Sequence, residues 1–175
     1  MRERLIELMS IETNAVVRKP LGACTDKYDR DWSPRVEGEF ARVSYGRDLE
    51  NLWQVTEAAR AAGLPFSPYV DLFTSNFAYC RKYGFDEERG GFYTSGGFNQ
   101  PASDRNKTWR AQAEGLVSAL TMYQITNRTE YFEVFRKTWG YWRSGANQVE
   151  KSPFYQGRAL IECLARLRSI REKTA

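Results

Sequence analysis

The feature that most constrains the fold is a spacing of apolar residues typical of helices, which recurs along most of the chain. From Asp48 to the stop signal at Gly63, apolar side chains return every three or four residues and therefore lie on one face of a helix. The same period runs from Lys107 to Ile125. No stretch shows the strict alternation typical of a half-buried strand, so the pattern predicts an all-α protein.

Six helices are expected, and the short connections between them favour antiparallel pairs. Aromatic residues flank a charged turn with two glycines over residues 85–93, which predicts one short β-hairpin insertion. The segment from Cys24 to Tyr45 has no clear period and is expected to be a long loop. The 175 residues suffice for one core, so a single domain over 1–175 is expected. The expected helices are Glu3–Val17, Asp48–Gly63, Pro68–Gly84, Lys107–Ile125, Thr129–Trp139 and Pro153–Leu167.

The chain contains no histidine, which removes Ser–His and Cys–His couples and imidazole metal sites. Acid–base chemistry must therefore use Asp, Glu, Lys, Tyr or Cys with a shifted pKa. The net charge of +4 comes from interspersed charges, without the basic stripe that nucleic-acid binding needs. No glycine-rich phosphate loop is present. We expect no nucleic-acid partner, no metal and no other cofactor.

The N-terminal segment carries acidic residues within its apolar pattern, unlike a secretory signal, and no apolar run approaches membrane-spanning length. The three cysteines are odd in number and form no C-x-x-C pair, so they are expected to be free thiols. These observations predict a cytoplasmic protein without a membrane partner.

Four polar and aromatic motifs stand in a characteristic order along the chain. They are SYGRDLENLW at 44–53, the glycine-rich segment at 87–93, KTWRAQAE at 107–114 and PFYQGRALIECL at 153–164. In this order and spacing they resemble the N-acylglucosamine 2-epimerase superfamily, which includes cellobiose 2-epimerases and mannose isomerases. The resemblance runs from about Leu5 to Leu167, and the family chains are about twice as long. It implies that this chain is the C-terminal half of a twelve-helix (α/α)6 barrel.

The resemblance also implies a chemistry, the metal-free conversion of a reducing sugar by proton transfer at C2 through an enediolate. Two histidines of the family motifs correspond to Arg47 and Tyr155 in this sequence. Arginine stays protonated and cannot act as the base, although it could stabilise an enediolate. Weak or absent turnover is therefore expected of this chain alone. The alternatives are a non-catalytic carbohydrate-binding module and a half-barrel subunit that needs a separately encoded N-terminal half.

The motif positions give seven candidate site residues. The spacing alone leaves other roles open, because Arg47 and Glu50 could form a surface ion pair, and the two tryptophans could pack in the core. Tyr155 could be a half-buried aromatic residue. Three acids at 86–88 are expected to be solvated turn residues rather than a cation site. The candidates are Arg47, Glu50 and Tyr155 as catalytic residues, and Trp53, Trp109, Glu114 and Arg158 as substrate-binding residues.

The expected partners are a reducing-end sugar and, because half a barrel is incomplete, either a second copy of the chain or an N-terminal half-barrel. Half a barrel is expected to leave the inner helix faces at Leu52, Leu116 and Leu164 without their opposite partners.

Overall fold

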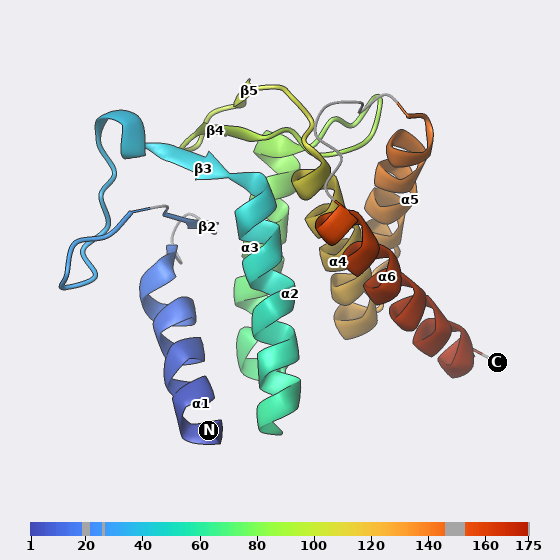
Figure 1. Cartoon of the computed structure of the whole chain (residues 1–175), viewed down its shortest axis with the longest axis horizontal. Helices are drawn as coiled ribbons and strands as arrows, with labels where there is room; N and C mark the ends of the chain where they lie inside the picture. Colours follow the sequence, from blue (N-terminus) through green and yellow to red (C-terminus); the bar gives the residue numbers. More distant parts are fainter. Residues whose placement is uncertain (19–21, 26, 146–152, 175) are drawn as a thin grey trace.

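The computed structural model of the chain describes residues 1–18, 22–25, 27–145 and 153–174 (Figure 1). All six predicted helices are present, with ends that shift by a few residues from the expected ones. The helices are α1 (Arg2–Ile11), α2 (Tyr45–Ala62), α3 (Val70–Gly84), α4 (Trp109–Thr126), α5 (Thr129–Arg143) and α6 (Pro153–Thr174). A π-helical turn, Glu12–Val16, continues α1, and short 3-10 turns stand at Gly38–Phe40 and Ser67–Tyr69.

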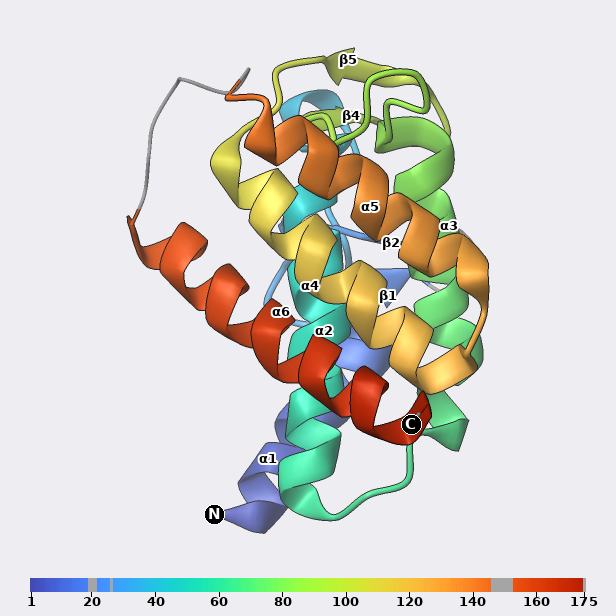
Figure 2. The ribbon, with the colours of Figure 1, turned by 90° about the vertical axis from the view of Figure 1, so that its right-hand side faces the viewer.

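Helix α4 lies at the centre of the arrangement. Every residue from Ala111 to Met122 is buried, because α2, α3, α5 and α6 all pack around this helix. Helix α1 packs against α2 at the edge of the molecule. Figures 1 and 2 show that α2, α4 and α6 all begin toward the same end of the molecule. Their first turns are therefore brought close together.

A small antiparallel sheet covers the end at which α2 and α4 begin (Figure 1). Its strands lie in the order β3 (Arg42–Ser44), β4 (Ser95–Gly97) and β5 (Ala102–Asp104). The predicted hairpin region contains only one isolated bridge, between Phe85 and Phe92, and the hairpin itself forms just beyond it. The segment expected to be a loop supplies β3, as well as β2 (Ala23–Cys24), which pairs with β1 (Val17–Arg18).

Two glycines show why particular helices end or approach closely where they do. Gly63 follows α2 with a φ of 66°, a left-handed conformation that glycine adopts at little cost and that ends the helix. Gly115 in α4 lies against the ring of Phe92, and a Cβ at this position would come within 2.5 Å of that ring. The absence of a side chain at Gly115 therefore allows the segment after α3 to pack on α4.

The packing of the core differs from what the sequence predicted for the inner helix faces. Leu52 and Leu116 are only 2% and 1% exposed, because α2 and α4 pack directly on each other. The expectation that both would lack partners is wrong, and only Leu164 on α6 is exposed, at 55%. The three cysteines are free, as predicted, and all three are buried.

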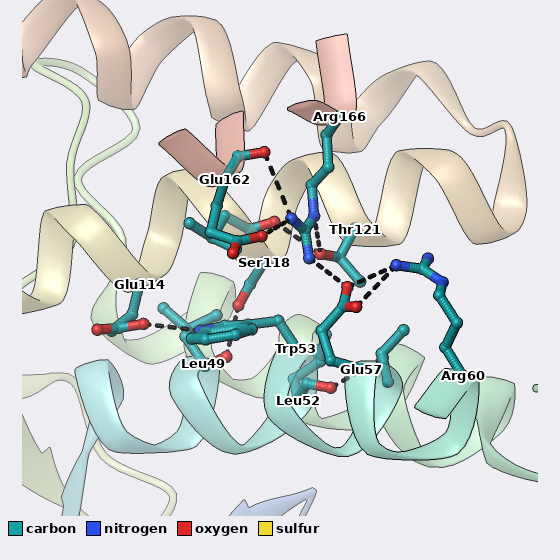
Figure 3. Close-up of polar contacts among 12 residues, drawn as sticks. Leu49, Leu52, Trp53, Glu57, Arg60, Glu114, Ser118, Thr121, Glu162 and Arg166 are labelled. Carbon is teal, nitrogen blue, oxygen red and sulfur yellow. Dashed lines mark hydrogen bonds and ion pairs between the residues drawn. The ribbon is translucent and has the colours of Figure 1, made fainter. Parts of the chain in front are cut away.

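A network of hydrogen bonds and ion pairs around Arg166 joins α2, α4 and α6 toward their C-terminal halves (Figure 3). Arg166 of α6 is 5% exposed, and its Nε donates to Thr121 Oγ1 of α4 at 2.9 Å. Its Nη2 donates to Glu57 Oε1 of α2 at 2.7 Å, and its Nη1 pairs with Glu162. A buried guanidinium group needs all of these acceptors, so this network fixes the position of α6 along α2 and α4.

Among the described residues, no helix is long and apolar enough to cross a membrane. The same ranges contain no group of three or more His, Cys, Asp or Glu side chains that could hold a metal ion.

Candidate functional site

The first turns of α2, α4 and α6 bring charged side chains of three sequence motifs into one cluster. Glu50 comes from α2, Arg110 and Glu114 from α4, and Arg158 from α6. Arg158 pairs with Glu114 and, at 3.5 Å, with Glu50, while Arg110 pairs with the other oxygen of Glu50. We call these four residues the arginine–carboxylate cluster. Its alternating charges link all three helices where they begin.

Glu114 is the most deeply buried member of this cluster. Its side chain is fully buried, and the indole N–H of Trp53 donates to its Oε2 at 2.7 Å (Figure 3). Arg158 binds the other carboxylate oxygen. Burial raises the pKa of Glu114 to about 7, against the lowering effects of the Trp53 hydrogen bond and the Arg158 charge. A chain without histidine therefore has a carboxyl group that changes charge near neutral pH.

Aromatic rings surround the guanidinium group of Arg158. Its Cζ lies 5.0 Å from the ring centroid of Trp53, 5.4 Å from that of Phe154 and 5.5 Å from that of Tyr155. Arg110 also lies 5.5 Å from the Tyr155 ring. Tyr155 is thus placed between two cations, and such contacts favour a fixed position for each guanidinium group.

The structure brings together five of the seven residues predicted from the motifs: Glu50, Trp53, Glu114, Tyr155 and Arg158. The other two lie differently. Arg47 is exposed in the first turn of α2. Trp109 is buried, with its ring 5.3 Å from that of Trp142 in an edge-to-face contact, as core packing would also require.

One member of the cluster, Arg110, was not predicted. Its signal in the sequence is its position four residues before Glu114 on the same helix, which places both side chains on one face. Two of the three acidic residues at 86–88 pair with cations outside the cluster: Asp86 with Lys107 at 2.8 Å, and Glu87 with Arg81 at 2.7 Å.

Four buried N–H donors at the end where α4 and α6 begin have no acceptor within the described ranges. They are Trp109 Nε1, Arg110 Nε, Gln156 Nε2 and Arg158 Nε, all in the first two turns of α4 and α6. Unpaired buried donors are costly, and here all four atoms are donors. A ligand rich in oxygen acceptors would suit this end of the three helices.

The N-acylglucosamine 2-epimerase (GlcNAc 2-epimerase) family matches residues 2–156, which is most of the chain. The chain belongs to this family. The match confirms the resemblance that the four motifs indicated. It also explains why residues of three separate motifs meet, since they stand at the starts of neighbouring helices of one fold.

Solved structures show the same fold. A sugar epimerase from a ruminal bacterium is 16% identical, with a TM-score of 0.81, and the match covers 94% of this chain and 47% of that one. A cellobiose 2-epimerase from Spirochaeta thermophila is 19% identical, with a TM-score of 0.76 and coverages of 97% and 47%. A D-mannose isomerase is 15% identical, with a TM-score of 0.69 and coverages of 94% and 54%. The chain therefore spans about half the length of these proteins, and its helices form half of an (α/α)6 barrel.

Proposed function

We propose that the chain binds a reducing-end sugar at the arginine–carboxylate cluster and carries out slow proton transfer at its C2 atom through an enediolate. The observation that carries this proposal is the meeting of Glu50, Glu114, Tyr155 and Arg158 at the starts of three helices. The similar proteins named as epimerases and an isomerase support the reaction class.

Each side chain has a role that its surroundings suit. The cations of Arg110 and Arg158 would stabilise the negative oxygen of the enediolate. Glu50 and Tyr155 keep partial exposure and would exchange the proton at C2. Glu114 is fully buried and would act by holding Arg158, with Trp53 fixing its second oxygen. Arg47 would add positive charge at the exposed start of α2.

The test records sugar binding and proton exchange in the same sample. Mannose, glucose and cellobiose are each incubated with the chain in deuterium oxide. Saturation-transfer NMR reports binding, and loss of the C2 proton signal reports exchange. We expect binding of at least one sugar with slow loss of that signal. Tyr155→Phe and Glu50→Gln should abolish the exchange, because each removes a proton-carrying group.

Glu133→Gln serves as the matched control, since this glutamate lies on the exposed side of α5 in a surface pair with Arg136. Its exchange rate should equal that of the unaltered chain. Exchange that survives both site substitutions would place the chemistry elsewhere, and absence of binding for all three sugars would overturn the proposal.

A second candidate function is sugar binding without turnover. It is favoured by the occupancy of the carboxylates, because every oxygen of Glu50 and Glu114 already accepts a hydrogen bond or pairs with an arginine. A carboxylate with both oxygens engaged in this way must release one of these contacts before it can accept a proton from C2. Binding with no loss of the C2 proton over days would favour this second function.

A further inference from the structure

The large apolar side chains that are exposed gather at the edges of the half-barrel. In the part of the chain that the structure describes, they lie on α1, on the loop before β3 and on α6. Figure 1 shows α1 at one side of the molecule and α6 at the other. Exposed apolar patches at such edges are typical of association sites. The residues are Met1, Leu8, Trp32, Phe154, Leu160, Ile161 and Leu164.

Helix α6 is apolar on two opposite faces. Ala159 and Cys163 are 1% and 7% exposed on the face that packs against α4. On the other face, Ile161 and Leu164 are 69% and 55% exposed, and Phe154 lies two turns before Ile161 on the same side. A helix with apolar residues on both faces is typically covered on both. The outer face of α6 therefore lacks a partner within the described chain.

We propose that two copies of this chain close into one twelve-helix barrel, in which α6 of each copy packs beside α1 of the other. The described residues of each copy form six α-helices, and the chain matches 47% of the length of two solved epimerases and 54% of the mannose isomerase. Two copies therefore have about the length of one complete relative. This proposal is independent of which sugar, if any, the chain binds.

The symmetry of the chain favours a second copy over another partner. A two-fold rotation about the barrel axis carries α6 of one copy to the α1 edge of the other, so both open edges are covered by two identical contacts. A single added helix would cover one edge and leave the other exposed. The contact also lies next to the cluster, since the exposed ring of Phe154 is 5.4 Å from the guanidinium carbon of Arg158.

Sedimentation of the purified chain at 5 to 100 µM tests the proposal. We expect a closed dimer of twice the 20.3 kDa chain mass. Leu8→Glu on α1 and Ile161→Glu on α6 should each raise the dimer dissociation constant about a hundredfold, because each buries an unpaired charge in the contact. Circular dichroism checks that each variant stays helical, and Ile161→Ser replaces Ile161→Glu if the latter does not fold.

The control is Gly140→Glu on α5, where an added side chain meets nothing within 4 Å, and Figure 2 shows α4 between α5 and α6. This variant should remain dimeric. A monomer at 100 µM would overturn the proposal, as would an open series of larger oligomers. A dimer that responds to Ile161→Glu but not to Leu8→Glu would also overturn it, because this result would mean that two α6 helices pair with each other.

Discussion

Replacing Glu114 by glutamine tests whether a buried carboxyl group changes charge on folding near neutral pH. Burial raises the pKa of Glu114 from 4.5 to about 7 in the folded chain, so between these pH values the folded state holds a proton that the unfolded state releases. The stability of the fold should therefore be highest below pH 4.5, with respect to this group, and should fall as the pH rises to about 7. Since one pH unit corresponds to about 1.4 kcal/mol, the loss amounts to about 3 kcal/mol.

Urea unfolding of the unaltered chain and of Glu114→Gln at pH 5, 6, 7 and 8 measures this loss. Glutamine does not ionise, so the free energy of unfolding of the unaltered chain minus that of the variant should fall by about 2.5 kcal/mol from pH 5 to pH 8, since part of the total loss lies below pH 5. The same series on Glu133→Gln, an exposed residue of α5, gives the background of removing a carboxylate. A difference that stays constant across the series would refute the reasoning, because Glu114 would then carry the same charge in both states.

Two further predictions concern packing and a buried ion pair. Gly115→Ala should lower the free energy of unfolding by about 1 to 3 kcal/mol, because the added methyl group meets the Phe92 ring. Gly140→Ala on α5, where an added methyl group meets nothing, should instead raise the free energy of unfolding by about 0.5 to 1 kcal/mol. Urea unfolding compares the two variants, and equal effects would contradict the close packing at Gly115. Burial opposes ionisation of Asp86, but the hydrogen bond and charge of Lys107 lower the pKa of that carboxyl to about 2, so the pair stabilises the fold above pH 4 and less as the pH falls toward 2. Lys107→Met should therefore cost about 2 kcal/mol at pH 7 and clearly less near pH 2, as acid titration of unfolding would show.

The helices could be predicted from the sequence because their signals are local. The repeat of apolar residues lies within each helix, and the start and stop signals, such as Pro153 and Gly63, lie at the ends of the helices that they define. The sheet could not be predicted in the same way. Strand β3 pairs with β4 across about fifty residues, and three-residue strands with two glycines show no alternation that a sequence pattern could reveal.

The burial of Leu52 and Leu116 could not be predicted from the sequence either. The apolar face of each helix could be predicted, but which helix would cover that face depends on how α2 and α4 cross.

In the candidate site, too, some features could be predicted from the sequence and others could not. The motifs predicted which positions meet, and Glu50, Glu114 and Arg158 do meet. Local sequence could not give the partner of each charge, because these pairs join different helices. The near-neutral pKa of Glu114 follows from its complete burial, which depends on three helices at once. Arg110 shows the opposite case, since its spacing from Glu114 was a local signal that could have identified it.

The two arginines of α6 also bear on the order in which the fold can form. Arg158 meets Glu50 across 108 residues of sequence, and Arg166 meets Glu57 across 109. A contact of such separation closes a long loop, and the entropy lost in that closure opposes the contact. Neither ion pair contributes to any arrangement of α2, α3 and α4 that lacks α6. Both contribute only when α6 is in place, so they couple the stability of α2 to the docking of α6.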